Sequence, residues 1–243
     1  MNELVHTKQG KMHAGRACAK ESTRTNDPER TKADILAVAE VEFGEKGLAG
    51  ARIDEIAAAT RTSKRMIYYY FGSKEGLYLA VLEESYRKIR QEETDLHLES
   101  LEPEAALKRL VGFTFDRHLR NESYVRIVMS ENIHRGQFMR QSQYIQDLNV
   151  PAIDAIRELY QRGVASGVFR PGLDPVDIHA SISALSFFNV SNRHTFGLIF
   201  KLDTSLPEYQ AQRRDNVVEM IWRYLRRCTA AGADQHLGFS LNG

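Results

Sequence analysis

The segment from Arg52 to Lys74 constrains the fold of this chain more than any other part of its sequence. Ile53 and Ile56 recur at helical spacing, which predicts one buried face on a first short helix. The next residues, 60–62, break this periodicity. Ser63 then favours the start of a second helix, because its hydroxyl can accept a backbone N–H of the first turn. The pattern therefore predicts two short helices separated by a tight turn.

The second short helix combines a narrow apolar stripe with a basic and aromatic outer face. Ile67 and Phe71 are four residues apart and are predicted to face the core, and Gly72 is suited to end the helix. The outward side chains are predicted to be Lys64, Arg65, Met66, Tyr68 and Tyr69, with Tyr70 near the edge. Residues 61–74 contain four Lys or Arg and no Asp or Glu.

These features together favour binding to double-stranded DNA. An α-helix fits the major groove, where its first residues reach base edges, and phosphate oxygens bind Lys, Arg and hydroxyl donors. The alternative interpretation is a solvated charged face beside an aromatic patch of the core. The turn, the helix cap and the acid-free window occur together, and this coincidence favours DNA binding.

The same segment closely resembles the helix-turn-helix of the TetR family of transcription regulators. The matching residues are Ile56-Ala57, Ser63, Ile67-Tyr68, Tyr70-Phe71 and Lys74, within a window from about Ile35 to Val81. The resemblance implies base contacts for Lys64, Arg65, Met66 and Tyr68, and phosphate contacts for Tyr69, Tyr70 and Lys74. Arg52 and Ser63 complete the predicted DNA-binding set.

Two places depart from the family pattern. The usual turn glycine is Arg61 here and the apolar residue after it is Thr62. A residue other than glycine in a left-handed turn costs roughly 1 kcal/mol. Ala51 and Arg52 stand where a threonine or serine usually begins the first helix, so the turn and this cap are expected to differ from the family.

The sequence divides into four predicted parts. They are a flexible basic arm (1–28), a helix-turn-helix domain (29–74), a helical effector-binding and dimerisation domain (75–228) and a tail (229–243). The arm either lies along DNA or is an inert leader, and both hypotheses stay open. Residues 1–74 carry 13 Lys or Arg against 10 Asp or Glu, a net +3, although the whole chain is only +1.

Helix signals continue along the whole chain and predict an all-α fold. Asp27 and Pro28 are suited to begin a helix that Gly47 ends. No Gly/Ser linker follows Phe71, so a helix over 74–93 is expected to join the head rigidly to the body. Further helices are predicted at 103–119, 123–133 (capped by Ser123), 142–164 (kinked or split by Pro151), 175–194 and 208–228. The last two are separated by the segment FGLIF and a loop through Pro207. The expected architecture is a three-helix head on a larger helical body, as the TetR resemblance implies.

The resemblance places the segments 175–194 and 208–228 where TetR-type proteins pair with a second copy. Dimerisation also has a geometric reason, since two heads one helical turn apart, roughly 34 Å, read a palindrome. The candidate interface residues are Ile182, Leu185, Phe188, Val217, Ile221 and Tyr224. The alternative is that these residues belong to the ordinary core.

A ligand pocket is expected inside the body, lined by aromatic residues and a few polar groups. The candidates are Phe113, His118, Met129, Tyr144, Phe187, Asn189, Asn192, His194, Phe196 and Trp222. The run SFFNVSNRHTF mixes phenylalanines with amides and a histidine, which a planar polar or heteroaromatic effector would satisfy. For any single residue, a satisfied core or interface position is the favoured alternative. The body loosely resembles regulators of nitrogen-heterocycle or pyrimidine catabolism within the family.

Several other classes of protein are not favoured by the sequence. No glycine-rich phosphate loop, GxSxG or HExxH motif occurs, and the histidines show no i, i+4 pair, so we expect no enzyme, cofactor or metal site. There is no run of about 18 apolar residues and no N-terminal apolar stretch, and Cys18 and Cys228 form no CxxC pair, so a cytoplasmic location is expected.

The sequence thus predicts a homodimeric, ligand-responsive DNA-binding regulator. The expected form is a repressor that binds a palindromic operator and is released by a small-molecule effector. The alternatives are an activator with the same head and a ligand-binding or scaffold protein without DNA function.

Overall fold

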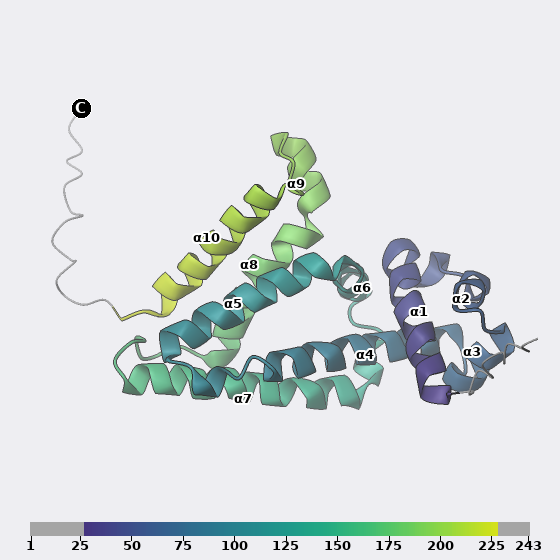
Figure 1. The fold of residues 1–243 in the computed structure, drawn as a ribbon, viewed down its shortest axis with the longest axis horizontal. Helices are drawn as coiled ribbons and strands as arrows, with labels where there is room; N and C mark the ends of the chain where they lie inside the picture. Colours follow the sequence, from purple (N-terminus) through teal and green to yellow (C-terminus); the bar gives the residue numbers. More distant parts are fainter. Residues whose placement is uncertain (1–26, 228–243) are drawn as a thin grey trace, which may run out of the picture.

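Helices account for almost all regular structure in the computed structural model, which describes residues 27–227 (Figure 1). The elements are α1 (Pro28–Gly50), α2 (Ile53–Thr60), α3 (Lys64–Phe71), α4 (Lys74–Thr94), η1 (Leu98–Ser100), α5 (Pro103–Arg120), α6 (Glu122–Ile133), η2 (Met139–Gln141), α7 (Gln143–Ala165), α8 (Pro175–Ser191), α9 (Arg193–Phe200) and α10 (Pro207–Leu225). Within this range one isolated bridge, between Phe169 and Arg226, is the single strand-like pairing. The all-α prediction is confirmed. The predicted arm and tail lie almost entirely outside the described residues.

The first helix begins and breaks where its sequence signals predict. The Asp27 carboxylate accepts the backbone N–H groups of Glu29 and Arg30 at 3.1 and 3.2 Å, and Pro28 occupies the first turn. Gly47 has φ +66° and ψ 172°, which interrupts the helix before a short final turn. Both predictions for α1 are therefore confirmed.

The turn between α2 and α3 has a left-handed residue at Arg61. Its φ of 53° and ψ of 33° are values that glycine adopts without steric cost. The Arg61 N–H donates to Ala58 O at 3.2 Å, and the Thr62 N–H donates to Ala57 O at 3.1 Å. These two bonds close the end of α2 in a left-handed turn, although the residue at its centre is arginine and not glycine.

The start of α2 is capped from another helix. Arg52 makes no side-chain cap bond within the described chain, but its backbone N–H donates to Glu42 Oε1 of α1 at 3.1 Å. Glu42 is largely buried, and Lys46 Nζ lies 2.9 Å from its other carboxylate oxygen. A carboxylate from α1 thus fixes the backbone of the N-cap residue of α2, which no side chain of α2 itself caps.

The fourth helix joins the head to the body without interruption. The Ser73 hydroxyl accepts the Gly76 N–H at 3.0 Å and begins α4. Leu77 and Val81 lie in the core of the head, whereas Ile89 packs with residues of α6 and α8. Figure 1 shows α4 running from α1–α3 into the body beside α7. The predicted continuous helix between head and body is therefore present.

Head and body share one hydrophobic core. Ile127 of α6 and Ile145 of α7 are buried in the same cluster as Ile35, Phe43 and Ile67 of the head. The Arg126 Nε of α6 also donates to Gly44 O of α1 at 2.6 Å. The head is thus attached through α6 and α7 as well as through α4.

The rest of the body is a layer of long helices. α5, α7, α8 and α10 surround a second core that includes Leu107, Phe115, Leu159 and Ile178. In Figure 1, α8, α9 and α10 lie at the side of the molecule remote from α2 and α3.

Two boundary predictions are wrong. Ser123 does not cap the helix at 123–133, because Asn121 both ends α5 and precedes α6, and Ser123 instead packs against Gly44. The helix predicted to run to about His194 stops at Ser191, and the FGLIF segment after it lies in helix α9. Of the kink or split expected at Pro151, the split is absent, because α7 continues through this residue as one helix.

Replacing Arg61 with glycine is expected to raise the free energy of unfolding by about 0.5–1 kcal/mol. Release of the left-handed strain is partly offset by the larger conformational entropy of glycine in the unfolded chain. Urea unfolding without DNA measures the change. Arg61→Ala is the control, since it keeps the strain, and equal stability of the two variants would contradict the interpretation.

Candidate nucleic-acid interface and ligand cavity

The outer face of α3 is exposed and cationic. Ile67 is fully buried, whereas Lys64, Arg65 and Tyr68 are exposed and Tyr69 is 77% exposed. The Ser63 hydroxyl accepts the Met66 N–H at 3.2 Å, which confirms the predicted cap. α3 lies at one extremity of the molecule in Figure 1, where a groove of DNA can reach it.

Two of the predicted DNA contacts share one acid of α2. Asp54 forms an ion pair with Lys64 and lies 3.8 Å from Arg52. All three side chains are substantially exposed, so these pairs contribute little stability and water screens them. Phosphate oxygens can therefore take the place of Asp54 as partners of Lys64 and Arg52.

The other predicted contacts are held more firmly by the head. Met66 and Tyr70 are half-buried, and Lys32 of α1 lies 5.5 Å from the centre of the Tyr70 ring. Lys74 Nζ donates to Ala49 O at 3.3 Å, which ties the start of α4 to the end of α1. Lys32 was not among the predicted DNA-contact residues.

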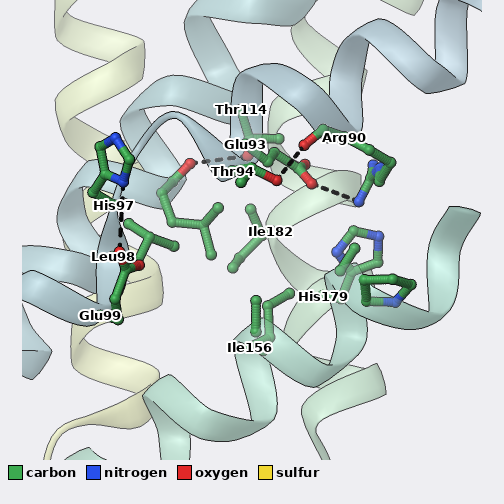
Figure 2. A pocket seen from close by; sticks show the side chains of 14 residues that line it. Arg90, Glu93, Thr94, His97, Leu98, Glu99, Thr114, Ile156, His179 and Ile182 are labelled. Carbon is green, nitrogen blue, oxygen red and sulfur yellow. Dashed lines mark hydrogen bonds and ion pairs between the residues drawn. The ribbon is translucent and has the colours of Figure 1, made fainter.

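The body contains a cavity of two adjoining hollows between α4, α5, α6, α7 and α8. Their volumes are about 340 and about 310 Å³, and both are lined by Arg90, Glu93, Thr114 and His179. Aromatic walls of the larger hollow are Tyr86, Phe113, Tyr124 and Phe187. The smaller one has apolar walls that include Ile156 and Ile182, and Figure 2 shows it with Arg90 and His179 on the side opposite His97 and Glu99.

Two arginines lie at the larger hollow with incomplete hydrogen bonding. Arg117 is only 5% exposed, and its Nε and Nη1 have no hydrogen-bond partner among residues 27–227. Glu92 Oε2 is 3.2 Å from Arg117 Nε without forming a hydrogen bond. Arg90 Nη1 lies 2.6 Å from Glu93 Oε2, and Arg90 Nε has no partner in the described part of the chain.

Burial keeps the two histidines of the cavity uncharged near neutral pH. Burial, and then the charge of Arg117 and the proximity of His179, lower the pKa of His118 to about 4. Burial, and then Arg90, lower the pKa of His179. Burial also raises the pKa of Glu93, against the opposing effect of Arg90 and Arg117. The cavity therefore offers guanidinium donors beside neutral imidazoles and aromatic rings.

Three predicted effector residues line the cavity: Phe113, His118 and Phe187. The candidates Met129, Tyr144, Asn189, Asn192, His194, Phe196 and Trp222 do not line either hollow. The Asn189 Oδ1 atom accepts a hydrogen bond from Arg213 Nε, 3.1 Å away. His194 is exposed and lies beside Glu122. Trp222 packs on the second core beneath Lys108, 5.3 Å from the ring centre.

The sequence-based prediction missed both cavity arginines. Arg117 follows Leu110 and Thr114 at helical i, i+4, i+7 spacing, so the buried stripe of α5 places it inside. Arg90 follows Tyr86 by one turn on the inner side of α4. Helical periodicity was thus the available signal for both arginines.

Most candidate interface residues belong to the core of one chain. Ile182, Val217 and Ile221 are buried, Leu185 and Tyr224 are half-buried, and Phe188 is 43% exposed. Exposed apolar side chains gather instead on α9 and the following turn, with further ones on α8 and α10. These are Val176, Phe188, Leu198, Ile199, Phe200, Leu202, Leu206 and Met220.

Residues 27–227 contain no group of three or more His, Cys, Asp or Glu that could hold a metal ion. No helix in this range is long and apolar enough to cross a membrane.

Comparisons with known proteins agree with this arrangement of a head and a body. Residues 35–81 match the family model described as bacterial regulatory proteins, tetR family. Residues 103–221 match the model described as tetracyclin repressor-like, C-terminal domain. The chain is 35% identical over 208 residues to the HTH-type transcriptional repressor NicS of Pseudomonas putida, which covers 86% of this chain and 98% of that protein.

More distant relatives and solved structures extend the match. The HTH-type transcriptional repressor SCO4008 of Streptomyces coelicolor is 33% identical over 144 residues, 57% of this chain and 69% of its own. A crystal structure of the regulator SCO4942 from the same organism has a TM-score of 0.60 at 25% identity, over 82% of this chain and 99% of that one. A tetR-family protein from Rhodococcus RHA1 has the same fold, with a TM-score of 0.64 at 19% identity over 82% and 99%.

Replacing His118 with glutamine is expected to flatten the pH dependence of stability between pH 7 and pH 5. Below about pH 6.5 the unfolded chain binds a proton at His118 that the folded chain accepts only near pH 4, so stability falls as the pH falls. Between pH 7 and pH 5, His118 is expected to lower the free energy of unfolding of the unsubstituted protein by about 2 kcal/mol, and the variant should lack this decrease. Urea unfolding at several pH values measures it.

His194→Gln is the matched control, because this histidine is exposed and lines neither hollow. An unchanged slope in His118→Gln would show that the folded protein accepts the proton as readily as the unfolded chain.

Proposed function

The chain belongs to the TetR family of bacterial regulatory proteins and is a DNA-binding transcriptional regulator, and on that premise we propose that it is a ligand-responsive repressor. The observation that carries this proposal is the coexistence of an exposed cationic α3 with a buried cavity on α4, the helix that enters the head. The relatives NicS and SCO4008 are both named transcriptional repressors, which supports the sign of regulation.

We assign operator recognition to the start and outer face of α3. Lys64, Arg65, Met66 and Tyr68 project from its first turns, where a helix in the major groove reaches base edges. We assign phosphate contacts to Arg52, Ser63, Tyr69, Tyr70 and Lys74 around it. The Lys74 contact with Ala49 orients this ammonium at the junction of α1 and α4.

A second copy of the chain is the proposed occupant of the apolar face on α8, α9 and α10. Leu198 is 81% exposed, Ile199 71% and Phe200 58%, and the rings of Phe188, Phe196 and Phe200 pack beside them, so that exposed apolar groups gather as they do at interaction sites. This face lies at the side of the body away from α2 and α3, so two heads remain free to face DNA (Figure 1). A palindromic operator would match the twofold symmetry of such a dimer.

Effector binding is proposed to reach the head through α4 and α6. Arg90 and Glu93 of α4 and Tyr124 and Val128 of α6 line the cavity. α6 also holds α1 through Arg126. A ligand that binds one arrangement of these helices more tightly shifts the population of head positions, and so weakens operator binding by the same differential affinity.

Alanine at Arg65 or Tyr68 is expected to weaken binding to the operator by about 1–3 kcal/mol while leaving binding to random DNA nearly unchanged, because these residues are assigned to bases. Lys74→Ala is expected to weaken both, with a salt dependence reduced by about one phosphate contact. Fluorescence anisotropy with DNA flanking the protein's own gene measures these effects.

Arg157→Ala, an exposed arginine of α7, is the matched control for loss of charge. In a separate assay, transcription in vitro from the same DNA should fall when the protein is added. Equal losses for all three variants on operator and random DNA would refute the assigned roles, and a rise in transcription would refute repression.

The double substitution Leu198→Asp and Ile199→Asp is expected to convert the dimer to a monomer, because two desolvated carboxylates would oppose the apolar contact. Operator affinity should fall at least a hundredfold, since one head binds in place of two. Sedimentation velocity and anisotropy measure both changes. Ile133→Asp, which alters a 76% exposed isoleucine of α6, is the control and should remain dimeric.

A further inference from the structure

Two buried guanidinium groups at the larger hollow lack sufficient hydrogen-bond acceptors. Arg117 is only 5% exposed, and its Nε and Nη1 atoms have no hydrogen-bond partner among residues 27–227. Arg90 adds Nε and Nη1, which form no hydrogen bond within the same range. Buried charges of this kind are strongly destabilising unless they are paired and hydrogen-bonded, so their retention calls for an acceptor.

The acids that face these arginines do not satisfy them. Glu92 lies at the edge, 44% exposed, and touches Arg117 at one position, 3.2 Å from Nε. Glu93 approaches Arg90 at Nη1, 2.6 Å away, and neither pair is bidentate. The neighbouring His118 and His179 add no negative charge. A planar anion with two oxygen atoms would fit the fork of N–H groups that an arginine presents.

The walls around Arg117 are suited to a flat ring. His118 lies parallel to Tyr124, with ring centres 6.4 Å apart and planes at 4°, and Phe187 meets His118 edge-on at 5.6 Å. Phe113 and Val128 complete the apolar lining. A volume of about 340 Å³ accommodates a molecule with one aromatic ring and a short polar substituent.

We propose that the effector is a small aromatic carboxylate, whose carboxylate binds Arg117 and Arg90 and whose ring lies among Phe113, Tyr124 and Phe187. This inference rests on the proposed ligand-responsive function. It also suggests how binding moves the head. The carboxylate competes with Glu92 and Glu93, both on α4, for arginines on α5 and α4, and so changes how the second half of α4 is held.

The test uses the full-length protein and three acids, each paired with its neutral amide: benzoate with benzamide, phenylacetate with phenylacetamide, and salicylate with salicylamide. We expect at least one carboxylate to raise the melting temperature by several degrees at millimolar concentration, whereas its amide does not. Titration calorimetry then gives the affinity of that carboxylate. Absence of any shift with all three acids, or equal shifts with the amides, would overturn the proposal.

Substitutions that remove a positive or a negative charge from the cavity should change carboxylate affinity in opposite directions. Arg117→Gln should weaken carboxylate binding at least tenfold, and Glu93→Gln should strengthen it about fivefold, because a competing carboxylate is removed. Arg214→Gln, which alters a half-buried arginine paired with Asp116 outside the cavity, should leave affinity unchanged. If Arg117→Gln does not fold by circular dichroism, Arg90→Gln takes its place. Weaker binding in Glu93→Gln would indicate a cationic ligand and overturn the proposal.

Operator binding in the same samples separates this inference from the function on which it rests. A carboxylate that binds through Arg117 but leaves operator affinity unchanged would contradict the ligand-responsive function and not the assigned ligand class. Operator release by the amides with no response to the carboxylates would contradict the ligand class and not the function.

Discussion

The structure depends above all on the packing of α6 against α1. Gly44 approaches Ser123 so closely that a Cβ at position 44 would lie 2.8 Å from the serine Cα. Arg126 fixes this contact by donating to the carbonyl oxygens of Gly44 and Glu45, 2.6 and 3.2 Å away. Because α6 also forms a wall of the cavity, one helix contacts both the head and the proposed ligand site.

The charged groups of the cavity lie on α4 and α5. Arg90, Glu92 and Glu93 lie on α4, and Arg117 lies on the neighbouring α5. Glu93 pairs with Arg90, and Glu92 pairs with Arg117. Burial makes each of these charges costly alone, so the relative position of α4 and α5 is sensitive to any change in pairing. The aromatic groups around them, by contrast, provide shape that does not depend on charge. The cavity thus combines aromatic walls with ion pairs that a bound anion could exchange.

Much of the head could be predicted from sequence because its signals are local. Asp27, Ser63 and Gly47 act on the backbone of their own turns, and each acts where it was expected. The left-handed Arg61 could be anticipated from the family's glycine at that position. The cap of α2 could not, since Glu42 lies ten residues away and reaches Arg52 only after α1 and α2 pack.

The body was less predictable because its site depends on helix phase and on contacts between distant segments. The aromatic content of SFFNVSNRHTF suggested a pocket, but Phe187 alone of its residues lines the cavity, while α9 turns the later part of the run outward. The residue type alone does not show whether an arginine is buried, so Arg90 and Arg117 were missed although helical spacing places them on inner faces. For Ile182, Val217 and Ile221, an apolar stripe did not distinguish the core from an interface.

The shared core has a consequence for the modularity of such regulators. A fragment cut after residue 74 would lose Leu77 and Val81 of α4 together with Ile127 and Ile145, and would expose the surfaces on which they pack. A hybrid that transplants this reading head onto a foreign sensor would therefore have to carry α4, α6 and the first turn of α7 with it. New combinations of operator and inducer are more readily obtained by changing side chains within the intact chain than by exchanging its parts.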